Sequence, residues 1–218
     1  MSMKENWDRW AESDPYYAVI THPSNRGGDN KVFWESGGHA ASTAKMILSL
    51  VDLNISDMKI AELGVGVGRV GSQLNKMCSG YVGIDVSDKM MAVCSKHHPE
   101  LKLQNVTEPF PNVDMFYSLI TLQHCEHSEM NMLIDRMFKA SKVAVMFQLP
   151  DIPYAGEMPH QEEPYMPMYG SPIVKVIEQA FTHGFSPSVI LKDKSVGPSE
   201  DSYCYLFTRK NPLTYDQT

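Results

Sequence analysis

Three glycines at alternate positions follow an apolar run in the segment Glu62-Leu63-Gly64-Val65-Gly66-Val67-Gly68. Glycine allows a sharp backbone turn and lets a ligand approach the main chain, because it has no side chain. A helix that starts after such a turn offers free N–H groups to a polar or anionic ligand. The spacing therefore predicts a binding site between a strand and a helix.

Asp85 closes the next apolar run, Tyr81-Val82-Gly83-Ile84. A carboxylate at the end of the second strand can accept two hydrogen bonds from ribose hydroxyls. Together, the glycine turn and this carboxylate predict a cofactor that contains a nucleoside.

Two kinds of nucleoside cofactor fit the pattern, and they differ in where the turn starts. The segment Gly66-Val67-Gly68-Arg69-Val70-Gly71 also matches the G-x-G-x-x-G fingerprint of dinucleotide binding. If Gly66 opens a dinucleotide-binding turn, the strand must continue through Gly64. In the alternative register the strand ends at Glu62 and the turn starts at Gly64. The glycines alone leave both registers open, so an NAD(P)-dependent reductase using Gly66 to Gly71 is an alternative function.

The same residues resemble the class I S-adenosylmethionine-dependent methyltransferases, whose first motif is E/D-x-G-x-G-x-G and whose second strand ends in an acidic residue. Both features are present here, and the resemblance runs from about Met58 to Arg209. An N-terminal block with Trp7 and Trp10 is similar to the leader of small bacterial members. The resemblance implies methyl transfer, with S-adenosylmethionine as cofactor and S-adenosylhomocysteine as product. A non-catalytic scaffold that keeps the cofactor fold is a second alternative.

The resemblance also implies which positions contact each part of the cofactor. The methionyl part would face Glu62 and the backbone of Gly64, Val65, Gly66 and Gly68. Asp85 would hold the ribose. The adenine would lie against Val86, Asn105 and Val106, and the sulfonium beside Leu119 and Gln123. Asn105 departs from the Asp that the family often has, which makes this contact neutral but leaves a hydrogen bond available.

His124 is the candidate general base. Such a base is optional, because an in-line displacement at an activated methyl group mainly needs a positioned nucleophile. His124 follows the expected fourth strand, and imidazole titrates near neutral pH. A histidine that only packs or hydrogen-bonds is the alternative. The run from His124 to His127 suggests no metal site, because adjacent side chains at a strand end diverge.

Short β-type runs alternate with helical patterns from Met58 onward, which is typical of a parallel sheet with crossover helices. We predict an α/β fold of the Rossmann-like, doubly wound type. Its sheet is expected to have seven strands, mostly parallel, with an antiparallel last strand. The expected strands are 59–63, 81–84, 101–104, 116–122, 142–149, 188–191 and 203–208.

Residues 58–218 form the expected cofactor domain, and residues 1–57, with all three tryptophans, form a helical N-terminal cap. Six prolines lie among tyrosines and methionines in 150–172, which predicts a lid loop near the carboxyl ends of the strands. A loosely ordered surface loop is the alternative. The candidate acceptor contacts come from the cap and the lid: Tyr16, Tyr17, Trp34, Tyr154, Tyr165 and Tyr169.

Composition narrows the acceptor class. The 218 residues carry 19 Lys and Arg against 26 Asp and Glu, a formal charge of −7. Nucleic acid is therefore not expected as a substrate, because no overall positive field gathers phosphates. Methyltransferases that act on the amino groups of DNA bases carry an Asn/Asp-Pro-Pro-aromatic motif after the fourth strand. This chain has Thr121-Leu122-Gln123-His124 there, which argues against such a substrate. We expect a small-molecule hydroxyl or amine acceptor, with a protein acceptor as the alternative.

The expected compartment is the cytoplasm. The amino terminus has no apolar signal segment, and no apolar run approaches the ~18 residues of a membrane span. The four cysteines are widely spaced, which suits reduced thiols. We expect no membrane partner.

Overall fold

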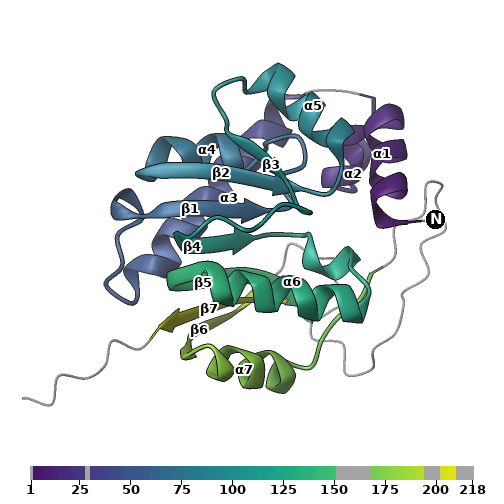
Figure 1. Ribbon diagram of the computed structural model, residues 1–218. Coiled ribbons are helices and arrows are strands. Elements are labelled where there is room, and N and C mark those ends of the chain that lie inside the picture. Colours follow the sequence, from purple (N-terminus) through teal and green to yellow (C-terminus); the bar gives the residue numbers. More distant parts are fainter. Residues whose placement is uncertain (1, 28–29, 151–167, 194–201, 210–218) are drawn as a thin grey trace, which may run out of the picture.

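The computed structural model describes residues 2–27, 30–150, 168–193 and 202–209 (Figure 1). These residues form a seven-stranded sheet in the order β3-β2-β1-β4-β5-β7-β6. Neighbouring strands are parallel except where β7 is involved, since β7 runs antiparallel to both β5 and β6. The predicted fold class is therefore confirmed, including the antiparallel last strand. The strands are β1 (Lys59–Leu63), β2 (Gly80–Asp85), β3 (Leu103–Asn105), β4 (Val113–Ser118), β5 (Ser141–Pro150), β6 (Phe185–Asp193) and β7 (Ser202–Arg209).

Helices cover both faces of the sheet and make three layers (Figure 1). One face carries α3 (Lys31–Ser49), α4 (Gly71–Met77) and α5 (Asp88–His97), and the other carries α6 (His127–Ala140) and α7 (Ile173–Thr182). Among the helices that the structure describes, none combines the length and apolar character that a membrane span needs.

Alternating side chains of the central strands supply both cores. In β5, Val145 and Phe147 pack with α6 and α7, whereas Ala144 and Met146 pack with the helices of the opposite face. Consecutive side chains of a strand point to opposite faces, so a strand covered on both sides is apolar throughout. This is why the central strands are recognisable as apolar runs in the sequence.

The predicted fourth strand is wrong at both ends. It was expected at 116–122, but β4 spans Val113–Ser118. The apolar residues after Ser118 leave the sheet because Ile120 has a left-handed backbone, with a φ of 54°. A short 3-10 turn, η3 (Leu122–His124), follows. The strand β6 is also longer than the predicted 188–191.

Two N-terminal helices, α1 (Met3–Ser13) and α2 (Pro15–Val19), lie beyond the carboxyl ends of β1 and β2 (Figure 1). Ser2 caps α1 with a capping box: its hydroxyl accepts from the Glu5 N–H while the Glu5 carboxylate accepts from the Ser2 N–H. Short 3-10 turns, η1 (Pro23–Asn25) and η2 (Ile55–Asp57), precede α3 and β1.

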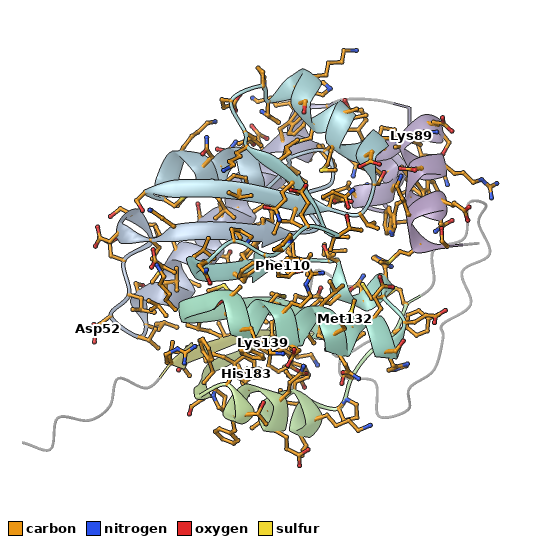
Figure 2. All side chains as sticks on the ribbon, in the orientation of Figure 1. Asp52, Lys89, Phe110, Met132, Lys139 and His183 are labelled. Atoms are coloured by element: carbon orange, nitrogen blue, oxygen red, sulfur yellow. The ribbon has the colours of Figure 1, made fainter. Side chains whose placement is uncertain are left out.

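Polar contacts attach α1 to α5. The Ser87 hydroxyl donates to the Asp8 carboxylate at 2.6 Å, and Lys89, on α5 beside α1, forms an ion pair with Glu12 (Figure 2). These partners are far apart in sequence. They place α1 over the end of the sheet where the glycine turn emerges.

Candidate cofactor-binding site

A pocket lies at the carboxyl ends of the central parallel strands, where the chain leaves β1, β2 and β4. In a doubly wound sheet this is the place where the strand order reverses, and ligands bind there. Helices α1 and α2 add to its wall. The pocket is lined by Met3, Trp7, Ala18, Val19, Glu62, Leu63, Gly64, Val65, Gly66, Arg69, Val70, Asp85, Val86, Met90, Val106, Leu119, Ile120, Thr121, Cys125 and Leu133.

The turn after β1 starts at Gly64, which decides between the two glycine registers. The strand ends at Leu63, and Gly64 already has a φ of 82°. A Cβ atom on Gly64 would stand 2.0 Å from Thr121 Oγ1, so only glycine fits there. The strand does not continue through Gly64, as the dinucleotide register requires.

Asp85 joins the end of β2 to the glycine turn. Its side chain accepts hydrogen bonds from the Gly66 N–H at 2.8 Å and the Ser87 N–H at 2.9 Å, and the residue is 8% exposed. Burial raises the pKa of this carboxyl group above its ordinary value. Each carboxylate oxygen can accept more than one hydrogen bond, so acceptor capacity remains for ligand hydroxyls.

Glu62 and Arg69 place an acidic and a basic side chain in the pocket wall. Glu62 is 3% exposed and accepts a hydrogen bond from the Tyr81 hydroxyl. Arg69 is 5% exposed and donates from Nη1 to the Ser36 hydroxyl at 3.2 Å. Burial raises the pKa of Glu62 to about 8, with the Tyr81 hydrogen bond and the Arg69 charge opposing it. A cationic ligand group beside Glu62 would therefore favour its ionised form.

The raised pKa of Glu62 predicts a pH-dependent stability of the protein without cofactor. The folded pKa of about 8 lies above the ordinary 4.5, so the stabilising contribution is complete below the unfolded pKa and is lost as pH rises through the folded one. We expect the free energy of unfolding to fall from about pH 5 to about pH 8, and to fall less in Glu62→Gln, which cannot ionise. Denaturant unfolding across this range measures both proteins, and parallel pH curves would contradict the prediction.

Part of the pocket lining is apolar. Val86 and Val106 follow the ends of β2 and β3, and Cys125 and Leu133 come from the segment after β4 and from α6. Asn105 is outside this lining: its Nδ2 donates to Asp88 Oδ1 at 2.8 Å and its Oδ1 accepts from the Thr107 N–H at 3.0 Å. An aromatic ring would meet mainly aliphatic side chains here.

The segment Leu119 to Thr121 forms the wall between β1 and β4. A left-handed backbone is costly for a β-branched residue such as Ile120. Gln148 on β5 supports it, because its Oε1 accepts the Ile120 N–H at 3.1 Å. The Gln148 amide nitrogen donates to Gln123 Oε1 at 3.1 Å and to the Ser202 hydroxyl. A buried polar network thus holds the turn, and Gln123 belongs to that network rather than to the pocket lining.

His124 does not line the pocket itself, but its ring packs against Trp7, which does. It is 7% exposed, and its ring centroid is 5.4 Å from that of Trp7, which lines the pocket. Its Nε2 is 3.3 Å from the Gln123 side-chain nitrogen. The catalytic role of His124 stays a prediction. Among the described residues, no group of three His, Cys, Asp or Glu side chains is placed to hold a metal ion.

The structure places the candidate acceptor residues of the cap outside the pocket lining. The Tyr16 hydroxyl is 2.7 Å from His97 Nε2, and the Trp34 ring packs edge-on against His98 with centroids 5.0 Å apart. The Arg26 guanidinium carbon lies over the Tyr17 ring, 3.6 Å from the ring centroid. Tyr16 and Trp34 therefore attach the cap to the end of α5.

The lid prediction falls mostly on residues 151–167, including Tyr154 and Tyr165, which lie outside the described residues. Tyr169 is described. Its N–H donates to the Gln123 carbonyl at 2.6 Å and its ring packs on His127.

Sequence reasoning missed several residues of the pocket wall. Met3 and Trp7 on α1, Val19 on α2, Arg69 and Thr121 all line it. Ser2 and Glu5 carry the signature of a helix start, which could have identified α1. The position of α1 over the pocket depends on its contacts with α5, which no local signal in the sequence indicates.

These residues fit S-adenosylmethionine. The cofactor has an amino-acid end with both charges, a ribose and an adenine. The pocket offers Glu62 and Arg69 near the glycine turn, Asp85 at the end of β2 and an aliphatic region next to it. The absence of a side chain at Gly66 leaves space between the glycine turn and Val19, because a Cβ atom there would stand only 3.2 Å from Val19 Cγ2.

Comparison with known proteins finds a methyltransferase domain and similar folds. A family model described as a methyltransferase domain matches residues 61–144. No curated protein matches the chain in sequence. Among solved structures, the magnesium protoporphyrin IX methyltransferase of Synechocystis PCC 6803 with bound S-adenosylmethionine has a TM-score of 0.68 at 14% identity, over 96% of this chain and 98% of that one.

Two further solved structures are similar. The N-methyltransferase NodS of Bradyrhizobium japonicum, in complex with S-adenosylhomocysteine, has a TM-score of 0.64 at 16% identity, over 95% of this chain and 98% of that one. A Pyrococcus horikoshii protein described as a candidate RNA methyltransferase has a TM-score of 0.59 at 19% identity, over 84% of this chain and 92% of that one. At these identities the similarity concerns the fold.

Residues 61–144 match a methyltransferase domain, and the whole chain has the fold that class I S-adenosylmethionine-dependent methyltransferases share. The protein is accordingly a methyltransferase that uses S-adenosylmethionine. The resemblance carried by the glycine turn and Asp85 is confirmed at the level of the class.

Proposed function

We propose that the enzyme methylates a hydroxyl or amine of a small molecule, with the cofactor bound in the pocket at the ends of β1, β2 and β4. The observation that carries the proposal is the character of the pocket wall beside Leu119 to Thr121. There α1 and α2 close the site with apolar side chains from Met3, Trp7 and Val19. Such a wall favours a small, partly apolar acceptor over an extended polymer.

Charge supports the same acceptor class. Arg69 is the one basic side chain among the described residues that line the pocket, and it is buried near the glycine turn. The chain as a whole has a formal charge of −7. Binding of a polyanionic nucleic acid draws on many exposed Lys and Arg side chains. A small uncharged or cationic acceptor therefore suits the pocket better than a nucleic acid does.

The residues of this chain act mainly by positioning. Asp85 would accept hydrogen bonds from the ribose, Glu62 would face the methionyl ammonium, and Val86 with Val106 would enclose the adenine. When bound, the cofactor supplies a methyl group activated by its sulfonium. Leu119 and the held turn at Ile120 would then orient the acceptor beside it, and Met3 with Trp7 would exclude water. His124 is our candidate for removing a proton from the acceptor.

Ligand-dependent unfolding tests the cofactor part of this proposal. S-adenosylhomocysteine and S-adenosylmethionine at about 100 times their dissociation constants are expected to stabilise the protein by ~2.7 kcal/mol, or roughly 5 to 10 °C for a chain of this size. NAD and NADP serve as matched nucleotide controls and are expected to give no shift. A shift with the dinucleotides alone would contradict the cofactor placement.

Transfer of a labelled methyl group tests the acceptor class. The enzyme is incubated with methyl-labelled S-adenosylmethionine and a cell extract separated into small molecules, protein and RNA. We expect label in the small-molecule fraction, and much less of it with Asp85→Ala at the same subsaturating cofactor concentration. Label transferred to protein or to RNA would overturn the small-molecule proposal.

A further inference from the structure

Gln148 on β5 belongs to a buried amide network that runs from the backbone of Ile120 through Gln148 and Gln123 to His124. Gln148 is 1% exposed, Gln123 is 3% exposed and His124 is 7% exposed. Polar groups buried to this extent pair with other protein groups in place of bulk water. The direction of each hydrogen bond therefore matters, because a donor that faces a donor leaves both groups unpaired.

The network has one fixed end, the N–H of Ile120. A backbone N–H only donates, so the atom of Gln148 that lies 3.1 Å from it must be the side-chain oxygen. The Gln148 side-chain nitrogen then lies on the other side, where it donates to Gln123 Oε1 at 3.1 Å and to the Ser202 hydroxyl. The main chain at Ile120 thus sets the orientation of the Gln148 amide group.

The orientation of Gln148 in turn sets that of Gln123 and the tautomer of His124. Since Gln123 Oε1 accepts from Gln148, the Gln123 amide nitrogen faces the other way, 3.3 Å from His124 Nε2. An amide nitrogen can donate but not accept. His124 Nε2 pairs with it only as an acceptor, so Nε2 is unprotonated and the neutral ring carries its proton on Nδ1.

The main chain around Gln123 is held independently of the amide network. The Gln123 carbonyl oxygen accepts the Tyr169 N–H at 2.6 Å, and the His124 N–H donates to the Thr121 carbonyl oxygen at 3.0 Å. These backbone contacts keep the two side chains beside each other. A change in the amide orientation would therefore change which atoms of Gln123 and His124 meet, not whether the two residues meet.

We propose that Gln148 is a positioning residue for methyl transfer: acting through Gln123, it keeps His124 in the tautomer whose Nε2 is unprotonated. A general base needs such a nitrogen before it takes a proton. The O–H or N–H bond of the acceptor would break, with the proton passing to Nε2 and the electron pair staying on the atom that receives the methyl group. The catalytic part of this inference rests on the proposed role of His124, whereas the tautomer does not.

Two substitutions of Gln148 change the tautomer in different ways. In Gln148→Glu, a carboxylate still accepts the Ile120 N–H but has no hydrogen for Gln123. The Gln123 amide is then expected to turn its oxygen toward His124, which requires a proton on Nε2 and gives the opposite tautomer. In Gln148→Met, no group orients the Gln123 amide, and we expect a mixture of both tautomers.

Nitrogen NMR of protein labelled with 15N-histidine reads the tautomer directly. The protonated and unprotonated ring nitrogens resonate far apart, and couplings to the ring C–H protons identify Nε2, which is bonded to both carbons that carry hydrogen. The loss of one ring pattern in His124→Gln assigns His124 among the eight histidines. Spectra of Gln148→Glu are followed up to about pH 10, above the pKa values of about 8 to 9 that buried glutamates reach, because a protonated carboxyl group would still donate.

Ser202→Ala is the matched control for the tautomer. It removes one partner of the Gln148 side-chain nitrogen but leaves the Gln148 oxygen facing Ile120, so the wild-type tautomer should persist. For function, Gln148→Glu should bind S-adenosylhomocysteine with unchanged affinity, because the Ile120 N–H keeps its acceptor. Its transfer of labelled methyl groups to the small-molecule fraction of a cell extract should fall about 100-fold, the lower end of what a general base contributes.

Each contrary result has a separate meaning. A wild-type His124 with its proton on Nε2, or a Gln148→Met protein that keeps the wild-type tautomer alone, would overturn the role of Gln148. The wild-type spectrum decides this even where a variant does not fold. A reversed tautomer with unchanged methyl transfer would overturn the catalytic part. A wild-type protein that labels no small molecule would overturn the proposed acceptor class and leave the tautomer result standing.

Discussion

Replacing Asp85 with alanine is expected to weaken binding of S-adenosylhomocysteine by roughly 10- to 150-fold, the range for losing hydrogen bonds to a charged group. The carboxylate is 8% exposed and stands at the tip of β2, where it also accepts the Gly66 N–H. The substitution therefore removes an acceptor for the ribose and also releases the glycine turn. Titration calorimetry with S-adenosylhomocysteine measures the change.

A matched control separates the local effect from a general loss of structure. Asp57 is exposed in η2, just before the opposite end of β1. Asp57→Ala is expected to leave the affinity unchanged. Asp85→Asn keeps one side-chain oxygen and should lose less than Asp85→Ala. Unchanged affinity in Asp85→Ala would show that the ribose is held elsewhere.

Two adjacent glycines of α3 are expected to respond to alanine with opposite signs. A Cβ atom on Gly37 would stand 2.0 Å from the Arg69 carbonyl oxygen, whereas one on Gly38 would have no heavy atom within 4 Å. Overpacking costs about 1 to 3 kcal/mol, so Gly37→Ala should lower the melting temperature by roughly 2 to 12 °C. Gly38→Ala should stabilise by about 0.5 to 1 kcal/mol, because alanine is the better helix former.

Thermal unfolding of the two variants beside the wild-type protein measures this difference. The pair differs by one position on the same helix, so each variant controls for the other's change in composition. A Gly37→Ala protein as stable as the wild type would mean that α3 can withdraw from the Arg69 backbone without cost.

The central sheet could be predicted because its signals are local. The strand predicted at 59–63 has the same bounds as β1. Covering helices make such strands apolar along their whole length, and the glycine turn that follows β1 is visible as a motif. The positions of Glu62 and Asp85 in the pocket wall follow from these two local features and the strand order.

The end of β4 could not be predicted because it depends on a residue far along the chain. The run from Leu119 to Leu122 is apolar enough to continue a strand. Gln148 instead holds Ile120 in a left-handed conformation from β5. The same limit applies to the contacts of Tyr16 and Trp34 with His97 and His98, which no local signal indicates. Their role toward an acceptor stays a prediction. Packing between distant elements decided these positions.

The order of strands in the sheet sets an order for assembly during synthesis. Strand β6 leaves the ribosome before β7, yet β7 lies between β6 and the rest of the sheet. Until residues 202–209 have emerged, β6 has no neighbour to pair with, β5 has an open edge, and Gln148 lacks the Ser202 hydroxyl. A nascent chain therefore carries the glycine turn early but completes the support of the turn at Ile120 only when β7 has joined the sheet.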